Sequence, residues 1–323
     1  MKQSHLFTYS LLLSVPFWWG INVFGIGMEN YFVDREIIKN PYILKAQMSS
    51  FISLPKAPEK IELGAKSAVS VLIKPSGEKE VVFSKNSDEK LAIASLTKLM
   101  SAYAVLNNLD LSRAITVSSD SFLNKGIHNG FSAGQAFKAK DVLFASMVES
   151  SNDGISILTQ PFGSSAFINL MNMEAKYIGL NNTEFFNPTG LDPDNPDEGV
   201  NYSTASDLEI LAEKIFQNPI ASEMLSLKEF DLYNINGVFS HKSITTNNIL
   251  LYPAELKGLE IIGGKTGETP IAKGCLLLIV KNARGEMLVN VILGSDDRFG
   301  EMIKLANWAN ALVNYKRILS LFN

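Results

Sequence analysis

The chain has 323 residues, of which 46% are hydrophobic and 19% are charged, so it can bury one large core or two modest ones. Its formal net charge of −4 argues against a nucleic-acid partner, because nucleic-acid-binding domains usually carry a basic face. The single cysteine, Cys275, excludes an internal disulfide, and its apolar neighbours predict that it is buried. None of the three histidines belongs to a zinc-hydrolase motif, so we expect neither a metal nor a cofactor.

The N-terminus differs in composition from the rest of the chain. Residues 6–28 contain no Asp, Glu, Lys or Arg, and this run is longer than the apolar region of a cleaved signal peptide. It is long enough to span a bilayer as a helix. We therefore predict that residues 1–28 form a retained signal anchor, that residues 29–64 form a juxtamembrane linker, and that residues 65–323 form the main folded domain.

The elements predicted for this domain begin with a hairpin, continue with a helical middle and end with further strands and a closing helix. The hairpin joins two β-rich runs across a turn at Pro-Ser-Gly, and apolar residues at helical spacing predict the helices. In chain order we predict strands at 68–73 and 81–83, a helix at 95–109, a helical block that continues through 140–158 and 166–180, a polar loop at 187–199, a helix at 206–216, strands at 261–267, 275–281 and 287–293, and a helix at 302–313. This order favours an α/β (α+β) fold, in which an antiparallel sheet is flanked by helices and carries a helical subdomain.

Three short motifs follow one another along this domain. They are Ser-Leu-Thr-Lys at 95–98, Ser-Ser-Asn at 150–152 and Lys-Thr-Gly at 265–267. The first places a hydroxyl and an amine on one face at the start of a predicted helix, whose N-terminus would stabilise a developing oxyanion. Together the motifs supply a nucleophile, a nearby lysine, a polar relay and a cationic strand. Acyl transfer through a serine ester needs such a set when no histidine base is available.

Each motif has a simpler explanation when it is taken alone. Ser-x-x-Lys also begins at Ser76 and Ser87, in a turn and a charged loop that would not hold the serine against the lysine, and Ser95 could be only a helix N-cap. Ser-Lys-Asn at 84–86 has the same form as the second motif, and the second motif itself could be an ordinary helix end. Lys265 could lie at a solvated strand end. The order, spacing and context of the three motifs favour the catalytic interpretation.

These motifs resemble those of the low-molecular-mass penicillin-binding proteins, which are serine-type D-alanyl-D-alanine carboxypeptidases and share their fold with the serine β-lactamases. The resemblance covers about residues 65–315 and includes the stretches 179–192 and 202–208, which are typical of these carboxypeptidases. Two positions depart from the family pattern. Ser151 stands where the family usually has a glycine, and Lys273 stands where it often has a second small residue.

The resemblance implies four catalytic residues. Ser95 would be the nucleophile that becomes acylated. Lys98, desolvated and close to another cation, would accept the proton of Ser95. Ser150 would relay that proton to the leaving D-alanine, and Asn152 would hold the substrate amide.

The resemblance also implies how the substrate is bound. Lys265 and Thr266 would bind the terminal carboxylate of the substrate, and Gly267 would leave room for its backbone. The backbone N–H groups of Ser95 and Glu268 would form the oxyanion hole. The expected substrates are peptidoglycan stem peptides, and β-lactam antibiotics are expected to acylate the same serine as inhibitors.

Three other functions keep some support. A D,D-endopeptidase that cuts peptidoglycan cross-links cannot be separated from a carboxypeptidase by sequence. A serine β-lactamase deacylates with a carboxylate on a later loop, and Glu184 lies in a loosely similar element. A non-enzymatic binding protein would be expected to have lost Ser95 or Lys98, and both are present.

The location of the catalytic domain depends on two arguments that oppose each other. Lys2 precedes the apolar segment, whereas Arg35, Lys39 and Lys45 follow it, and this distribution weakly favours a cytoplasmic domain. Peptidoglycan, however, lies outside the cytoplasmic membrane. We therefore predict a single-pass membrane protein whose catalytic domain is extracytoplasmic.

Overall fold

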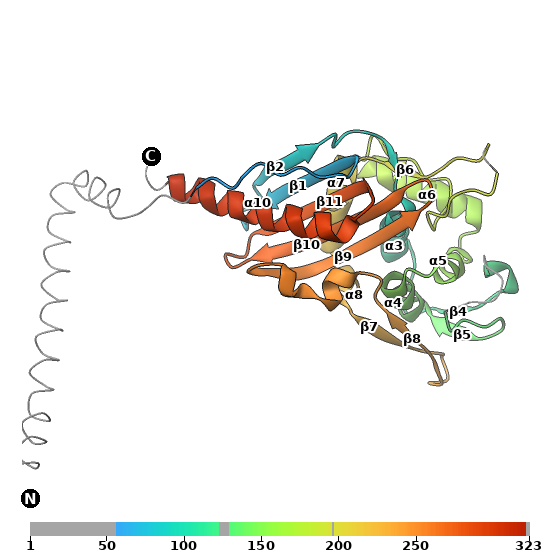
Figure 1. Cartoon of the computed structure of the whole chain (residues 1–323). Coiled ribbons are helices and arrows are strands. Elements are labelled where there is room, and N and C mark those ends of the chain that lie inside the picture. The colour runs from blue at the N-terminus through green and yellow to red at the C-terminus, as the bar shows by residue number, and fades with distance from the viewer. Residues whose placement is uncertain (1–55, 123–128, 196, 321–323) are drawn as a thin grey trace, which may run out of the picture. The chain divides into compact units, whose positions relative to one another are not determined.

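The computed structural model describes residues 56–122, 129–195 and 197–320 (Figure 1). Within these ranges, no helix combines the length and the apolar character needed to cross a membrane. The anchor predicted at residues 1–28 lies outside the described residues.

Residues 58–313 form one compact unit of the chain. The candidate site described below belongs to this unit. The residues just before the sheet, which were predicted as the end of a linker, already contact the domain. The indole Nε1 of Trp308 donates a hydrogen bond to the backbone carbonyl of Glu59 at 2.6 Å.

Five antiparallel strands form the central sheet in the order β2-β1-β11-β10-β9 (Figure 1). They are β1 (Ser67–Ile73), β2 (Lys79–Lys85), β9 (Leu259–Thr269), β10 (Lys273–Asn282) and β11 (Met287–Ser295). The first strand pairs with the last, with Val69 opposite Val291. Strand β9 is the last in this order and is therefore an edge strand, which pairs with β10 on one side only. The predicted fold class is confirmed.

The remaining elements are helices and short strand pairs. The helices are η1 (Ala94–Leu96), α3 (Thr97–Asn108), η2 (Ser119–Ser121), α4 (Ala139–Glu149), α5 (Asn152–Thr159), α6 (Ser164–Tyr177), α7 (Ala205–Phe216), α8 (Pro219–Ser226), α9 (Asn248–Leu251), η3 (Pro253–Glu255) and α10 (Arg298–Ser320). The short strands pair as β3 (Leu91–Ala92) with β6 (Tyr202–Ser203), β4 (Ala114–Thr116) with β5 (Ala136–Lys138), and β7 (Glu229–Tyr233) with β8 (Phe239–Ile244). The sequence patterns do not predict the β4–β5 and β7–β8 pairs.

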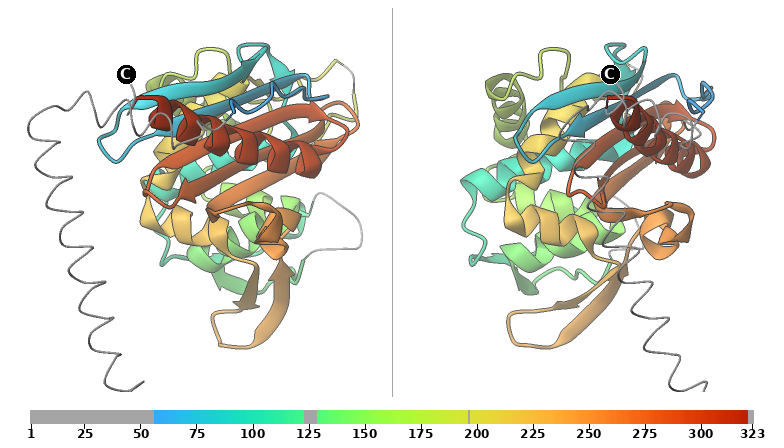
Figure 2. Two further views of the ribbon diagram at one scale, coloured as in Figure 1. Left: turned by 60° about the vertical axis from the view of Figure 1, so that its left-hand side comes forward. Right: turned by 90° about the vertical axis from the view of Figure 1, so that its left-hand side faces the viewer.

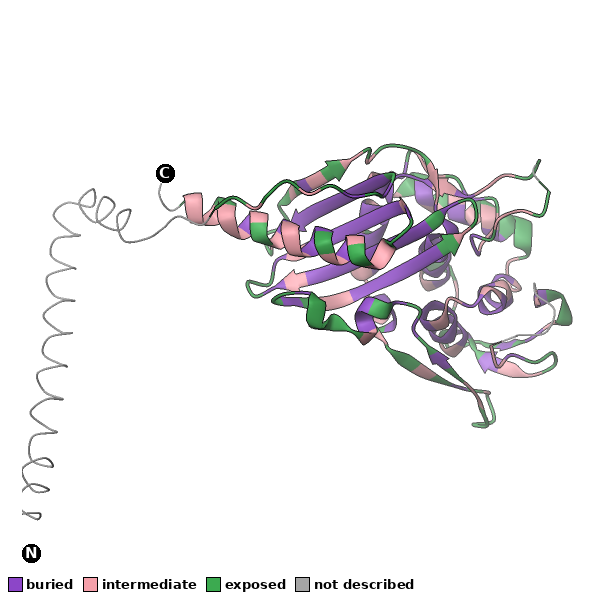
Figure 3. Cartoon of the chain, viewed as in Figure 1, coloured by how far each residue is buried: buried purple, intermediate pink, exposed green. Residues whose placement is uncertain are grey.

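Alternating side chains let the sheet bury both of its faces. In β10, Leu276 and Leu278 pack in the core formed with α10, whereas Leu277 and Ile279 belong to the core on the other face, where α7 lies (Figure 2). Strands β1 and β10 are buried along almost their whole length, as the colouring of Figure 3 shows. Cys275 of β10 is buried as predicted, and this burial raises the pKa of its thiol to about 11.

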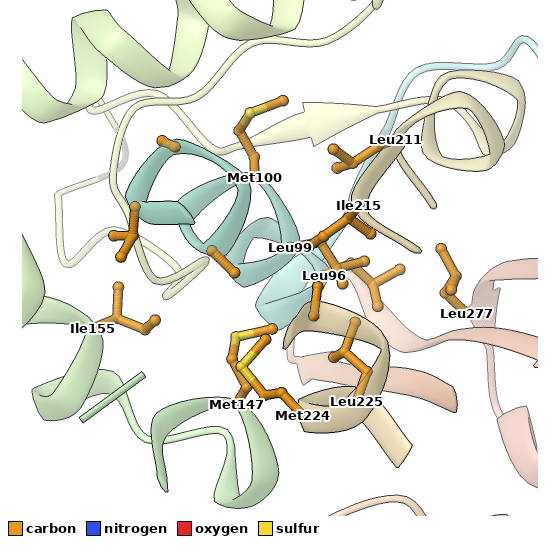
Figure 4. Packing of buried hydrophobic residues seen from close by; sticks show 14 of the residues in the cluster. Leu96, Leu99, Met100, Met147, Ile155, Leu211, Ile215, Met224, Leu225 and Leu277 are labelled. Carbon is orange, nitrogen blue, oxygen red and sulfur yellow. The ribbon is translucent and has the colours of Figure 1, made fainter. Parts of the chain in front are cut away.

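The larger core surrounds the beginning of α3. Leu96 and Leu99 lie there among side chains from the helical layer and from the sheet (Figure 4). The surrounding residues include Met147 of α4, Ile155 of α5, Leu211 and Ile215 of α7, Met224 and Leu225 of α8, and Leu277 of β10. The turn that precedes α3 is thus fixed by packing from several elements.

Candidate active site

Ser95 lies in η1, a 3-10 helix of one turn that leads directly into α3. The preceding residue, Ala94, has a φ of 46°, a left-handed backbone conformation that residues with a side chain rarely adopt. The Nζ atom of Lys98 lies 2.8 Å from the Oγ atom of Ser95. No side chain caps the start of either η1 or α3, so Ser95 does not act as an N-cap. The hydroxyl is held by the lysine and not by the helix backbone.

Lys98 is completely buried and is surrounded by oxygen atoms. Besides Ser95, its Nζ contacts the side-chain Oδ1 of Asn152 and the backbone carbonyl of Thr189, each at 2.7 Å. Burial removes the water that stabilises an ammonium ion, and the charge of Lys265 opposes a second positive charge nearby. These two effects, in that order, hold the pKa of Lys98 well below its usual value of 10.5.

The second motif forms a sharp turn between two helices. The helical block predicted over 140–158 consists of two helices, because Ser150 adopts a left-handed conformation (φ 62°, ψ 33°) at the end of α4. Ser151 then caps α5, where its Oγ accepts a hydrogen bond from the backbone N–H of Gly154 at 3.2 Å. The same hydroxyl donates to Asn129 at 3.0 Å. The serine that replaces the usual glycine thus fixes the start of α5, and Asn152 is the first residue of that helix.

The third motif lies on the edge strand β9. The Nζ atom of Lys265 donates to the Oγ atom of Ser150 at 2.7 Å and to the carbonyl of Thr266 at 2.8 Å. Burial, and then the charge of Arg298, lower the pKa of Lys265 to about 7. The hydroxyls of Thr266 and Thr246 are hydrogen-bonded at 2.6 Å. Lys265 thus joins the sheet to the turn between α4 and α5.

The last two predicted positions on β9 differ in their surroundings. Gly267 packs against η1, and a Cβ atom at this position would lie 3.0 Å from the backbone nitrogen of Ser95. The absent side chain keeps the space in front of that N–H group clear. The Glu268 side chain is 65% exposed and forms an ion pair with Arg298. The structure thus brings seven predicted residues together, and it directs the Glu268 side chain toward solvent.

The sequence profile of the D-alanyl-D-alanine carboxypeptidase family matches residues 54–297. The chain belongs to this family. It is 30% identical over 260 residues to the D-alanyl-D-alanine carboxypeptidase DacF of Bacillus subtilis, a match that covers 77% of this chain and 63% of that protein. It is also 30% identical over 268 residues to a D-alanyl-D-alanine endopeptidase of Pseudomonas aeruginosa, which covers 79% and 80% of the two chains.

The fold gives the same result. The crystal structure of the D-alanyl-D-alanine carboxypeptidase DacD from Francisella tularensis superposes with a TM-score of 0.67 at 26% identity, over 80% of this chain and 74% of that chain. The resemblance stated from the motifs is therefore confirmed. The chain spans less than two thirds of the length of the Bacillus relative.

Two features of this family member were not assigned a role from sequence. One is Arg298, the first residue of α10, whose charge acts on Lys265 and whose guanidinium lies 4.8 Å from the ring of Phe299. The other is the loop that follows α6, which supplies the Thr189 carbonyl to Lys98. The loop belongs to a stretch that is typical of the family. The role of the Thr189 carbonyl could not be predicted from sequence, because every residue type has a backbone carbonyl.

Asparagine side chains hold this loop in shape. The Oδ1 atom of Asn187 accepts hydrogen bonds from the backbone N–H groups of Thr189 and Gly190 at 3.1 and 2.7 Å. Asn201 donates to the carbonyl of Asn187 at 2.8 Å and to the hydroxyl of Thr97 at 3.0 Å. The loop is thus tied to α3 within one residue of Lys98.

The β-lactamase alternative from the sequence can be compared with this geometry. Glu184, the candidate deacylating carboxylate of a β-lactamase, accepts a hydrogen bond from the hydroxyl of Tyr202 at 2.6 Å and is exposed. None of the hydrogen bonds of Lys98 or Lys265 described above involves this carboxylate. Among the described residues, no group of His, Cys, Asp and Glu side chains could hold a metal ion.

Proposed function

We propose that this chain is a serine D-alanyl-D-alanine carboxypeptidase that removes the terminal D-alanine of peptidoglycan stem peptides and is inhibited by penicillin. One observation carries the proposal: the buried Lys98 faces Ser95 and two oxygens that can only accept hydrogen bonds. A neutral amine has two N–H groups and one lone pair. If Asn152 and Thr189 take the two N–H groups, the lone pair faces the hydroxyl of Ser95.

Acylation follows from this arrangement. Lys98 removes the proton from Ser95 as its Oγ attacks the carbonyl carbon of the penultimate D-alanine. Negative charge develops on the carbonyl oxygen, and the N–H groups of Ser95 and Glu268 would stabilise it. Gly267 supports this role, because its lack of a side chain leaves the Ser95 N–H accessible. Asn152 would also hold the amide of the substrate.

Release of the leaving group needs a proton and a cationic binding site. Ser150 would pass the proton from Lys98 to the amine of the leaving D-alanine, while Lys265 hydrogen-bonds its Oγ. Lys265 and Thr266 would bind the terminal carboxylate, and the Arg298 charge favours an anion at this end of the site. Water then attacks the acyl-enzyme and frees Ser95.

A D,D-endopeptidase is the second candidate, and the Pseudomonas relative of that name favours it. Both activities use the same acyl-enzyme and differ only in the leaving amine. Incubation of the full-length protein with purified muropeptides distinguishes them, because mass spectrometry reports either loss of one alanine or conversion of dimers to monomers. The Ser95→Ala variant is the control. If the unaltered protein yields neither product and binds no fluorescent penicillin at Ser95, the proposed function is wrong.

The localisation belongs to the proposal as well. Residues 6–28 carry no charged side chain, and the proposed substrate exists only outside the cytoplasmic membrane. The chain would therefore be a single-pass membrane protein with an extracytoplasmic catalytic domain. Protease added to intact spheroplasts should degrade the catalytic domain. A protected domain would overturn the localisation.

A further inference from the structure

Strand β8 lies beside the end of α4, the helix that leads into Ser150 (Figure 1). The imidazole Nε2 atom of His241 on β8 lies 2.8 Å from the Oε2 atom of Glu149, the last residue of α4. An ionised carboxylate only accepts hydrogen bonds, so the imidazole donates. The two side chains are 31% and 24% exposed, and protein therefore covers most of both. His241 thus holds the residue that immediately precedes Ser150.

A second contact from the same segment holds the backbone of α4. The N–H group of Thr246, which follows β8, donates to the carbonyl of Val148 at 3.3 Å. This carbonyl lies in the last turn of α4, where backbone carbonyls have no partner within the helix. Ser150 then adopts the left-handed conformation described above, which a residue with a side chain rarely keeps unless its surroundings impose it. The two contacts from the β8 segment supply that constraint on the α4 side.

The same strand also packs against the loop that positions Ser151. A Cβ atom at Gly130 would lie 2.1 Å from the Cβ atom of His241, so the loop backbone lies directly on this residue. The hydroxyl of Ser240 donates a hydrogen bond to the carbonyl of Gly130. The neighbouring Asn129 accepts the hydrogen bond from the Ser151 hydroxyl. Strand β8 is therefore placed between the end of α4 and the loop that holds the start of α5.

We propose that His241 is a positioning residue, which acts through Glu149 to keep the Ser150 hydroxyl in place as the proton relay. Lys265 holds that hydroxyl directly at 2.7 Å, and His241 fixes the backbone from which it extends. The imidazole does not itself carry the transferred proton, which moves from Lys98 through Ser150 to the leaving amine. This inference rests on the proposed function, because it requires Ser150 to act as the relay.

Two substrates that differ in their leaving group test the inference. The amine of D-alanine needs a proton as the C–N bond breaks, whereas the thiolate that leaves from the D-thiolactate thioester of the same acyl group does not. In the full-length protein, His241→Leu should lower kcat/KM for Nα,Nε-diacetyl-lysyl-D-alanyl-D-alanine roughly three- to tenfold, the scale of one hydrogen bond. It should leave kcat/KM for the thioester within about twofold of the unaltered value, because acylation by a thioester needs no relay. His241→Gln, which keeps a side-chain N–H group, should restore the value for the peptide.

A matched control and a second variant accompany this measurement. Lys242→Met on the same strand removes exposed ion pairs with Glu229 and Asp231 and should leave the ratio of the two kcat/KM values unchanged. Glu149→Ala should reproduce the effect of His241→Leu, and the double variant should lose no more, because the two side chains act as a pair. The ratio does not depend on the fraction of folded protein, so a loss of stability cannot imitate the effect.

The outcomes separate this inference from the proposed function. If His241→Leu leaves the ratio unchanged, whether both substrates are slowed equally or not at all, the inference is overturned and the carboxypeptidase remains intact. Additive losses in the double variant also overturn it, because His241 would then not act through Glu149. If the unaltered protein cleaves neither substrate, the proposed function fails and the positioning role fails with it.

Discussion

Replacement of Gly190 by alanine should disturb the nucleophile from a position outside the three motifs. Gly190 follows Thr189 in the loop after α6 and has a φ of 83°. A Cβ atom at this position would overlap the carbonyl oxygen of Ala94, the residue before Ser95, and would lie 2.8 Å from the Thr97 hydroxyl. The substitution therefore pushes the loop and the turn η1 apart at the point where both contact Lys98.

The magnitude follows from two costs. An alanine in a left-handed conformation costs about 1–2 kcal/mol relative to glycine, and overpacking of a filled site adds about 1–3 kcal/mol. Gly77 provides the matched control, because it has a φ of 85° and no atom within 4 Å of the position of its Cβ. Gly77→Ala should lower the free energy of unfolding only by the conformational cost. The difference between the two variants isolates the contact with Ala94, and we expect it to be about 1–3 kcal/mol.

The assay compares the free energy of unfolding of both variants in urea with the rate of acylation by a fluorescent penicillin. Gly190→Ala should be less stable than Gly77→Ala by the difference given above, and it should be acylated more slowly under conditions where both are folded. The reasoning is refuted if the two variants have equal stability and equal acylation rates.

Three further predictions concern the site. Lys98→Arg should reduce the acylation rate constant for penicillin by several orders of magnitude, because arginine does not give up its proton, and a near-normal rate would rule out Lys98 as the base. Ser151→Ala should lower the free energy of unfolding by about 1 kcal/mol through loss of the α5 cap; denaturant unfolding that shows no loss would contradict this role. The pKa of Lys265 near 7 means that its protonated fraction falls as pH rises through that value. The kcat/KM of the free enzyme with a carboxylate-bearing penicillin should therefore decline above about pH 7, and a flat profile from pH 6 to 9 would show that Lys265 does not bind the carboxylate.

Much of the fold could be predicted because its signals are local. The apolar runs of β10 and β11 predict buried strands, and the spacing of residues from Met302 to Val313 predicts the closing helix. The polar residues at 150–152 indicate a helix end, but they do not indicate the left-handed conformation of Ser150, because apolar residues continue through α4 into α5 at helical spacing.

The three motifs and the residue types needed for acyl transfer could be read from the linear chain, because helical spacing alone places Ser95 near Lys98. The chemistry of Lys98 could not. An exposed lysine on an isolated helix would keep its usual pKa, since water would surround its ammonium group. Asn152 and Thr189 come from positions 54 and 91 residues away, and Lys265 from a strand still farther along the chain. Only folding brings these groups together and excludes the water, and this loss of solvation is what lowers the pKa of Lys98.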